Sequence, residues 1–376
     1  MLGDSVYSVV ERGVAPAQFS AGKHRVDNGS LSTVTADCQA PRRGNRSSVT
    51  RSNGLPASGH PACRGRPAHY HRWVATSRRS LVAEVPAKIN LLLRVGAVRP
   101  DGFHELVTVF HGVELYDRVV AETASDFRLT VAGPEAGGLT AGPDNLVWRA
   151  AMRLAELGGI QPSGTLTVDK HIPLAAGLAG GSADAAATLR VCNELWQLGA
   201  TERDLATLAA ELGSDVPFAL GGGTALGTGR GEQLTAFDLV PELHWVIAAA
   251  DGGLSSPAVY AQLDRQRGSV ASVELPSITD ITEMFASPDP AALAGVLGND
   301  LQPAAIALAP FLQNTLDAGT KAGALAALVS GSGPTCVFLA ADLSRATQLA
   351  HELQASGTCR YARPVRGNAV TRVSER

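Results

Sequence analysis

The sequence predicts an α+β fold in two domains, preceded by a basic N-terminal extension. Strand-like and helix-like stretches are mixed without strict alternation, which favours α+β over a doubly wound sheet. A new set of strand and helix patterns starts at 244–250, so we place the domain boundary between 241 and 242. Residues 1–80 show no apolar period of a strand or a helix. The chain of 376 residues is long enough for two domains and a sizeable core.

The extension, residues 1–80, is predicted to be disordered because it is rich in Arg, Ser, Gly and Pro. It holds 12 Lys and Arg against 4 Asp and Glu, a net charge of +8. The remaining residues hold 20 against 31, a net charge of −11. We favour a non-functional or mis-assigned start over a basic arm or an organelle transit segment. Because the body is acidic, we expect no nucleic-acid partner.

Composition also indicates in which cellular compartment the protein is expected. No apolar run reaches the roughly 18–20 residues that span a bilayer, so no membrane partner is expected. The five cysteines form no CxxC pair, and no His/Cys cluster has zinc spacing. These features predict a reduced, cytoplasmic protein without a protein-ligated metal. Cys192 and Cys336 fall in apolar patterns and are expected in the core.

The first domain, 81–241, is expected to be built from strands and three helices. Its predicted strands are 80–98 (two strands, interrupted at 86–90), 104–122, 126–133 and 164–173, with a hairpin at 222–237. Its predicted helices are 144–159, 182–198 and 202–212. Asp144 or Asn145 is the expected N-cap of the first helix, with Gly158 as its stop, and Thr201 that of the third.

The second domain, 242–376, is expected to start with the apolar strand 244–250. Helical stretches follow at 256–265, 278–286, 290–297 and 303–321. The end of the chain is predicted as strand, turn and strand over 323–341, a helix over 343–356 and a last strand over 359–366.

A run of small residues, GLAGGSADAA (177–186), lies between a predicted strand and a predicted helix. It lacks the lysine of a P-loop and the glycine spacing of a dinucleotide fingerprint. A helix N-terminus presents unpaired N–H groups and a partial positive charge, which attract phosphate without a lysine. From these residues alone, a phosphate site and a helix start packed against a neighbour both remain open.

Two charged residues stand in apolar surroundings. Lys88, one of four lysines beside 28 arginines, lies at the expected strand break, where a compact ammonium group can be needed. Asp215 falls in a short turn before Pro217, where a carboxylate can be a positioned base. The alternatives are a solvated lysine at a bulge and an Asx-turn that starts the next segment.

Two further turns carry small or aromatic residues. DGFHEL (101–106) places Phe103 beside His104 on a hairpin, an arrangement that suits stacking on a planar base and hydrogen bonding to its edge. The alternative is a turn with one buried aromatic side chain. GSGP (331–334), in the stretch LVSGSGPTCVF (328–338), lies between two predicted strands, either as a tight hairpin turn or as a second loop that approaches a ligand closely.

The order of the motifs PAKIN, DGFHEL, PLAAGLAGGSADAA, LGSDVPF and SGSGPTCVF resembles the GHMP kinase superfamily over residues 81–370. PAKIN and DGFHEL are similar to the family that phosphorylates 4-diphosphocytidyl-2-C-methyl-D-erythritol (CDP-methylerythritol). The resemblance implies a ribosomal protein S5 domain 2-like domain (81–241) and a ferredoxin-like domain (242–376), with ATP, Mg²⁺ and substrate between them. It also implies phosphorylation of the substrate's 2-hydroxyl in the non-mevalonate isoprenoid pathway, by a cytoplasmic monomer or weak homodimer.

The resemblance further implies the role of each site residue. Lys88 and Asp215 would form the catalytic pair. Asn90 would hold the substrate, Phe103 and Tyr260 would cover the two faces of its cytosine, and His104 would bond its edge. Asn145 and Lys170 would lie near the adenine of ATP. The loop around the ATP phosphates would comprise Pro173, Leu174, Ala175, Ala176, Gly177, Leu178, Ala179, Gly180, Gly181 and Ser182.

Three residues depart from the usual pattern of this family. Ala179 stands where many members have glycine, and its methyl group is harmless only if its φ is negative. Asp184, one turn into the helix, would repel phosphate if it faced the ligand. Phe103 replaces the more usual tyrosine, which keeps stacking and loses a hydroxyl.

Three other functions fit the sequence less well than this one. Homoserine and mevalonate kinases share the superfamily, but their substrates have no base for DGFHEL to stack on. A catalytically inactive nucleotide sensor would be expected to lose Lys88 or Asp215, and both are present. A dinucleotide-dependent dehydrogenase fails on the spacing of the glycines.

Overall fold

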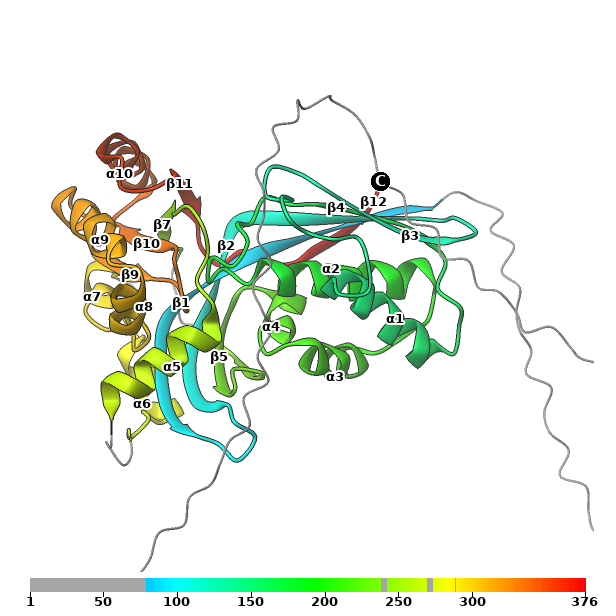
Figure 1. The fold of residues 1–376 in the computed structure, drawn as a ribbon, viewed down its shortest axis with the longest axis horizontal. Coiled ribbons are helices and arrows are strands. Elements are labelled where there is room, and N and C mark those ends of the chain that lie inside the picture. Colours follow the sequence, from blue (N-terminus) through cyan, green and yellow to red (C-terminus); the bar gives the residue numbers. More distant parts are fainter. Residues whose placement is uncertain (1–78, 238–241, 269–272, 288) are drawn as a thin grey trace, which may run out of the picture. The chain divides into compact units, whose positions relative to one another are not determined.

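The computed structural model describes residues 79–237, 242–268, 273–287 and 289–376, and almost all of the predicted extension 1–80 lies outside these ranges. The described residues form two β-sheets with helices packed on them (Figure 1). The mixture of antiparallel strands and grouped helices confirms the predicted α+β class.

Two strands of 19 residues, β1 (Ser80–Val98) and β2 (His104–Glu122), form the centre of the larger sheet. They pair antiparallel along almost their whole length. The predicted interruption at 86–90 is wrong, because β1 continues through it with register shifts after Pro86 and after Asn90. Between the shifts, the backbone N–H of Lys88 donates to the carbonyl oxygen of Leu178 at 3.1 Å. A bulge thus aims Lys88 at the loop without ending the strand.

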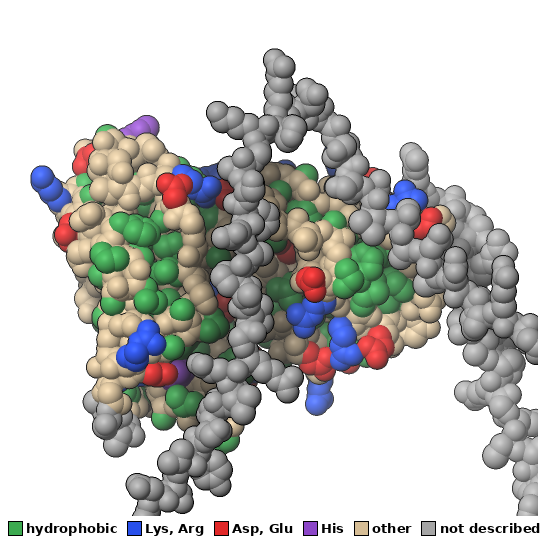
Figure 2. All heavy atoms as spheres, in the orientation of Figure 1, with side chains coloured by type: hydrophobic (Ala, Val, Ile, Leu, Met, Phe, Trp, Pro, Cys, Tyr) green, Lys and Arg blue, Asp and Glu red, His purple; other side chains and the backbone are tan. Residues whose placement is uncertain are grey.

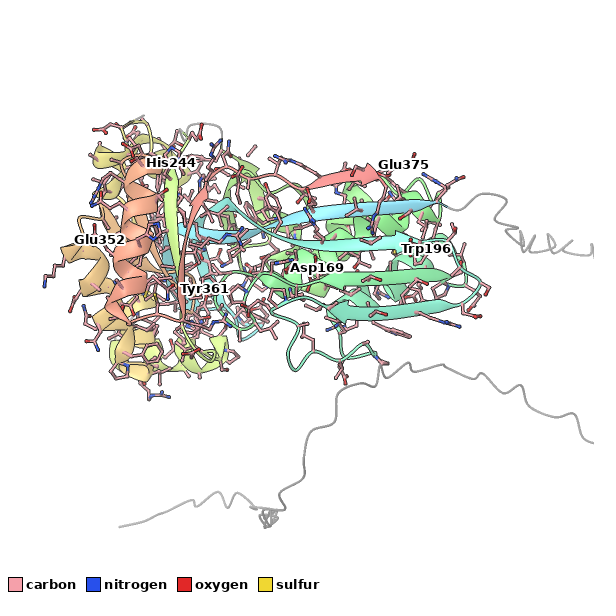
Figure 3. All side chains as sticks on the ribbon, turned by 90° about the horizontal axis from the view of Figure 1, so that it is seen from above. Asp169, Trp196, His244, Glu352, Tyr361 and Glu375 are labelled. Atoms are coloured by element: carbon pink, nitrogen blue, oxygen red, sulfur yellow. The ribbon has the colours of Figure 1, made fainter. Side chains whose placement is uncertain are left out.

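The larger sheet has eight strands in the order β12-β1-β2-β4-β3, with β5 on β2, β6 on β5 and β8 on β1. Its remaining strands are β3 (Phe127–Ala132), β4 (Gly164–Asp169), β5 (Thr224–Gly229), β6 (Gln233–Ala236), β8 (Gly298–Asn299) and β12 (Arg372–Glu375). Figure 3 shows Glu375 on the edge strand β12, beside β1. The division at 241/242 stays a prediction, and β8 and β12 come from beyond it in the chain.

Helices α1 (Leu146–Gly158), α2 (Gly180–Leu195), α3 (Glu202–Leu212) and α4 (Val216–Gly221) cover one face of this sheet (Figure 1). The predicted caps are confirmed: the side chain of Asn145 accepts the N–H of Val147, and Thr201 forms a capping box with Asp204. Gly159 rather than Gly158 is the left-handed residue that ends α1. The six-residue helix α4, which starts directly after Asp215, was not predicted.

The smaller sheet consists of β7 (His244–Ala249), β9 (Ala326–Val329), β10 (Cys336–Ala340) and β11 (Tyr361–Arg366), in the order β11-β7-β10-β9. This order and its antiparallel pairing fit the predicted ferredoxin-like arrangement. Helices α5 (Ser256–Arg267), α6 (Ile278–Met284), α7 (Pro290–Ala294), α8 (Gln302–Leu308), α9 (Phe311–Lys321) and α10 (Leu343–Ser356) complete this part.

The helix predicted over 303–321 is two helices, α8 and α9, because Ala309, directly before Pro310, leaves the helical conformation (φ −136°, ψ 77°). Cys192 and Cys336 are fully buried, as predicted. On the face in Figure 2, basic and acidic side chains lie interspersed with apolar ones. Among the described residues, no helix has the length and apolar character needed to traverse a bilayer.

Candidate active site

A cavity of about 750 Å³ is bordered by β1, the β1–β2 turn, the loop that leads into α2, the start of α4 and α5. Most of the predicted site residues line it. They are Lys88, Asn90, Phe103, His104, Pro173, Leu174, Ala175, Ala176, Gly177, Ala179, Gly180, Gly181, Ser182, Asp215 and Tyr260. Asn145, Lys170 and Leu178 do not line it.

Lys88 and Asp215 meet at one wall of this cavity. Lys88 is 6% exposed, and its Nζ donates to Oδ1 of Asn90 at 2.9 Å and lies 3.9 Å from Oδ2 of Asp215. Asn90 in turn donates to Thr108. The Asp215 carboxylate makes no capping bond to α4, which removes the Asx-turn alternative. The site therefore holds a nearly buried ammonium group next to a carboxylate that has room to accept a proton.

The loop 173–182 reaches α2 through three residues with left-handed φ: Ala175 (49°), Gly177 (75°) and Ala179 (58°). Alanine in this conformation costs about 1–2 kcal/mol, whereas glycine adopts it freely. The condition that made Ala179 harmless, a negative φ, is therefore not met. No side chain caps α2, so its first N–H groups remain open to an anion in the cavity.

A second loop of small residues, 330–333, packs against the first. A Cβ on Gly177 would lie 2.0 Å from the carbonyl oxygen of Ser330, so only glycine fits there. Oγ of Ser330 donates to the carbonyl oxygen of Gly177 at 3.1 Å. Gly331 and Ser332 line the cavity. The 330–333 segment is thus more than a hairpin turn, since it closes one side of the site.

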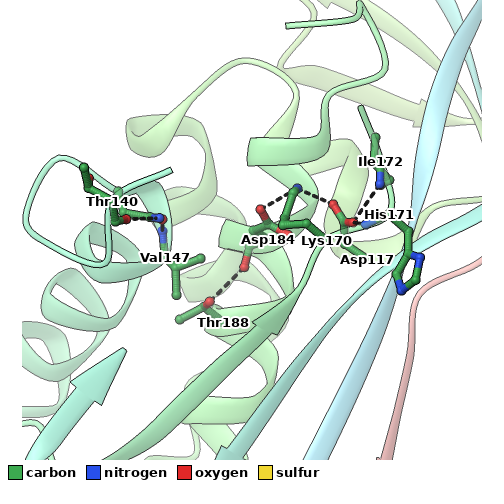
Figure 4. A network of polar contacts seen from close by, with 9 residues as sticks. Asp117, Thr140, Val147, Lys170, His171, Ile172, Asp184 and Thr188 are labelled. Carbon is green, nitrogen blue, oxygen red and sulfur yellow. Dashed lines mark hydrogen bonds and ion pairs between the residues drawn. The ribbon is translucent and has the colours of Figure 1, made fainter. Parts of the chain in front are cut away.

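Lys170, predicted to lie near the adenine, is fully buried beneath the loop and does not line the cavity. It forms ion pairs with Asp117 on β2 and with Asp184 in α2, the latter at 2.7 Å (Figure 4). Oδ1 of Asp117 also accepts the N–H groups of His171 and Ile172. Asp184 consequently faces Lys170, and its predicted repulsion of phosphate by direct contact does not arise.

Leu178 and Asn145 are the two other predicted residues that do not line the cavity. Leu178 is fully buried, and its carbonyl oxygen accepts the N–H of Lys88. The side chain of Asn145 is occupied, because it caps α1 and donates to the carbonyl oxygen of Thr140 at 2.8 Å. The next residue, Leu146, lines the cavity instead.

The far end of the cavity is aromatic. Phe103 is 50% exposed, and the guanidinium carbon of Arg230 lies 4.9 Å from its ring centroid. The ring of His104 stacks on Tyr260 with centroids 5.1 Å apart and 25° between the planes. Nε2 of His104 lies 2.9 Å from Oδ1 of Asp264 on α5. Burial, with a further contribution from the charge of Asp215, raises the pKa of Tyr260, so its hydroxyl stays protonated.

Sequence reasoning missed four residues of this region: Asp117, Arg230, Asp264 and Asn299. Asp117 could have been recognised from the sequence, because it lies two residues from both Leu115 and Val119 and so shares the inward face of their strand. Asn299 donates to the carbonyl oxygens of Val329 and Gly331 at 2.7 Å each and so holds the 330–333 loop. Arg230 and Asp264 stand in polar stretches without a pattern that marks them.

Two family descriptions match the chain: "GHMP kinases N terminal domain" at residues 145–223 and "GHMP kinases C terminal" at 270–359. The chain is 54% identical to the 4-diphosphocytidyl-2-C-methyl-D-erythritol kinase of Salinispora arenicola, over 75% of this chain and 90% of that one. It is 50% identical to the enzyme of that name from Mycolicibacterium gilvum, over 79% and 94%.

Solved structures show the same likeness. A crystal structure of 4-(cytidine 5'-diphospho)-2C-methyl-D-erythritol kinase superposes with a TM-score of 0.62 at 32% identity, covering 76% of this chain and 99% of that one. Homoserine kinase from Cytophaga hutchinsonii superposes with a TM-score of 0.61 at 18% identity, covering 78% and 97%. At that identity the second match shows the fold alone.

Proposed function

Because the chain belongs to the 4-diphosphocytidyl-2-C-methyl-D-erythritol kinase family of GHMP kinases, we propose that it transfers the γ-phosphoryl group of ATP to the 2-hydroxyl of CDP-methylerythritol. The product is the 2-phosphate, an intermediate of the non-mevalonate isoprenoid pathway. The observation that carries this proposal is one cavity that combines a Lys–Asp pair, a phosphate loop and an aromatic end.

The Lys88–Asp215 pair supplies the chemistry. The carboxylate of Asp215 accepts the proton of the 2-hydroxyl, and the oxygen forms a bond to the γ-phosphorus. The bond from that phosphorus to the β–γ bridging oxygen breaks, and ADP leaves with the electron pair. Lys88 stabilises the charge on the attacking oxygen and the transferred group. Since the transition state is loose, an ordinary aspartate suffices as base.

The loop 173–182 holds the triphosphate. The backbone of this loop lines the cavity, together with the uncapped N–H groups at the start of α2. The dipole of α2 favours negative charge there. Leu146 lines the cavity at the proposed adenine end, and Asn145 directly precedes it in the chain. A single 16-residue helix thus provides the anion site that a P-loop lysine provides elsewhere.

Mg²⁺ is expected to arrive with ATP. Among the described residues there is no group of three or more His, Cys, Asp or Glu that would cage a metal ion. The residues present nonetheless fit Mg²⁺, which typically takes one or two protein oxygens beside substrate phosphates. Ser182 and Asp215 line the cavity with a hydroxyl and a carboxylate. When bound, Mg²⁺ offsets the negative charge of the phosphates.

The aromatic end is proposed to bind cytosine, with Phe103 and Tyr260 against its faces. His104 is held by its stack on Tyr260 and by Asp264. If Nε2 of His104 donates to Asp264, Nδ1 is left as an acceptor for the 4-amino group of cytosine. We further propose that the protein is a cytoplasmic monomer or weak homodimer that acts on small molecules.

The full chain, ATP and a panel of alcohols test this proposal in an assay of ADP release. We expect turnover with CDP-methylerythritol and a phosphorus NMR signal for a new 2-phosphate, with little turnover of homoserine or mevalonate. Preferred turnover of another alcohol would show that the chain has a different GHMP kinase activity. ATP binding without turnover of any alcohol would identify a nucleotide sensor.

A further inference from the structure

Thr108 on β2 carries a buried hydroxyl group that the proposed chemistry does not use. The side of β2 that faces the cavity is otherwise apolar here, since Leu106 and Phe110 stand two residues away on either side and also border the cavity. Thr108 itself is 0% exposed, so its hydroxyl lies behind the cavity wall. A buried hydroxyl costs free energy unless it is hydrogen-bonded, and its partners therefore indicate its role.

The Thr108 hydroxyl both donates and accepts a hydrogen bond. Its Oγ1 donates to the carbonyl oxygen of Leu92 at 2.7 Å and accepts from Nδ2 of Asn90 at 2.8 Å. The register of β1 against β2 shifts between Asn90 and Leu92. The two partners of the hydroxyl thus flank a bulge in the strand that carries Lys88.

The hydrogen bonds of this chain run in only one direction. A backbone carbonyl oxygen only accepts, so the single hydroxyl hydrogen of Thr108 is used on Leu92 and the hydroxyl oxygen is left to accept. The atom of Asn90 that faces Thr108 must then be the amide nitrogen. The amide oxygen of Asn90 consequently faces Lys88, whose Nζ donates to it at 2.9 Å.

The direction of the Lys88 ammonium group depends on this amide oxygen. Within the part of the chain that the structure describes, the bond to Asn90 is the shortest polar contact of Nζ. Oδ2 of Asp215 lies 3.9 Å from Nζ, and the ring centroid of Phe110 lies 5.5 Å from it. A change in the orientation of the Asn90 amide would therefore change the position of the ammonium group.

We propose that Thr108 is a positioning residue for phosphoryl transfer, which aims the ammonium group of Lys88 through the amide of Asn90. This inference rests on the proposed function in taking Lys88 as the group that stabilises the attacking oxygen. Without the hydroxyl, the amide loses the bond that fixes which of its atoms faces Lys88. A turned amide would place two donors against each other, and the ammonium group would leave its position.

The test measures kcat for CDP-methylerythritol and the dissociation constant of ATP in variants of the full chain. Thr108→Val keeps the shape of the side chain and removes the hydroxyl. We expect kcat to fall about 10- to 100-fold, because a displacement of about 1 Å can already cost 100-fold. The constant for ATP should stay unchanged, since both hydrogen bonds of Thr108 go to β1 and not to the loop 173–182.

Thr108→Ser and Thr108→Ala form a second pair that differs only in the hydroxyl. Serine can make both hydrogen bonds, so this variant should keep most of the kcat of the unchanged protein. Alanine cannot make them, and its kcat should fall as that of Thr108→Val does. If Thr108→Val does not fold, this pair decides by the same comparison. The inference is overturned if the serine variant loses as much activity as a variant without the hydroxyl.

Thr315→Val is the matched control. Thr315 on α9 is 3% exposed, donates to the carbonyl oxygen of Thr358 at 2.7 Å and does not line the cavity. The change therefore removes a buried hydroxyl of the same kind outside the site. Urea titration should show a loss of stability in both valine variants, whereas kcat falls in Thr108→Val alone. Equal kcat values for Thr108→Val and Thr315→Val would reject the positioning role.

A double variant shows whether Thr108 acts through Asn90. In Asn90→Ala the amide is absent, so the further change Thr108→Val should lower kcat no more. If Thr108→Val lowers kcat by the same factor with and without the amide, the hydroxyl acts independently of Asn90 and the inference is wrong.

The same assays separate this inference from the proposed function. Normal turnover of CDP-methylerythritol by Thr108→Val rejects the inference and leaves the function. If the unchanged chain prefers another alcohol, and Thr108→Val but not Thr108→Ser lowers kcat for that alcohol, the inference is retained and the function is rejected. A chain that turns over no alcohol of the panel rejects both.

Discussion

The phosphate end and the base end of the cavity differ in how firmly the protein holds them. At the phosphate end, Lys88 is 6% exposed and Leu178 is fully buried. Backbone and side-chain bonds tie the loop to β1 and to the 330–333 segment. At the base end, Phe103 is 50% exposed and the side chain of Asp264 is 47% exposed.

This difference indicates which end of the cavity determines the rate of catalysis and which determines the affinity for the alcohol. The phosphate end is assembled before any ligand arrives, so its catalytic groups need little reorganisation. The base end presents aromatic surface that substrate binding would cover. Changes at the first end should therefore act on kcat and on folding, and changes at the second on KM for the alcohol.

The largest effect is expected from Asp215→Asn. Asparagine keeps the shape but cannot accept the proton, so kcat should fall about 10²- to 10⁴-fold while ATP still binds. Steady-state kinetics and an ATP titration measure the two quantities. Asp342→Asn is the control, because Asp342 caps the remote helix α10 and asparagine caps equally well. A kcat near that of the unchanged protein would remove Asp215 from the role of base.

Gly177→Ala should show how tightly the phosphate end is packed. The new methyl group would meet the carbonyl oxygen of Ser330 at 2.0 Å, at a φ of 75°. Overpacking costs about 1–3 kcal/mol of unfolding free energy and the left-handed φ about 1–2 kcal/mol more. Urea titration measures the change.

Gly181→Ala is the matched control for Gly177→Ala. Its methyl group would meet only Cδ1 of Leu146, at 3.5 Å, and it lies in α2, where alanine stabilises a helix by about 0.5–1 kcal/mol. Equal stability of the two variants would mean that the loop is not held against Ser330 in solution.

The elements that the sequence predicted correctly are those that local interactions determine, and the ones it missed depend on residues far away in the chain. Helix 343–356 was predicted to the residue because its cap and its apolar period are local. The strands β8 and β12 were missed, since two to four residues become a strand only through partners on β1. The course of β1 through 86–90 was also missed, because a local break signal cannot show that β2 continues opposite the bulge.

The site shows the same division. The motifs led to the correct prediction that Lys88, Asp215 and Gly177 belong to the site, since each of them stands in a short sequence pattern. The place of Lys170 depended on Asp117, which lies 53 residues earlier in the chain and binds it from another strand. Only the tertiary structure brings such partners together.

Phe103→Ala tests the base end. Loss of stacking on cytosine should weaken binding by about 1–3 kcal/mol, or about 5- to 150-fold in KM for CDP-methylerythritol, with KM for ATP unchanged. Phe311→Ala is the matched control, since Phe311 is 44% exposed on α9 and does not line the cavity. An unchanged KM for the alcohol would place the base elsewhere. A fall in stability would show that the base end, too, is part of the packed structure.

Ala179→Gly should have the smallest effect and refine the account of the phosphate end. Glycine removes the strain of a φ of 58°, about 1–2 kcal/mol, but gains about 0.4–1 kcal/mol of freedom in the unfolded chain. The net expectation is a stabilisation between zero and about 1.6 kcal/mol, measured by thermal unfolding. Ala183→Gly, four residues on in ordinary helix, should destabilise by about 1 kcal/mol instead. If both glycines destabilise equally, the left-handed turn at Ala179 is not strained, and the phosphate end tolerates alanine without cost.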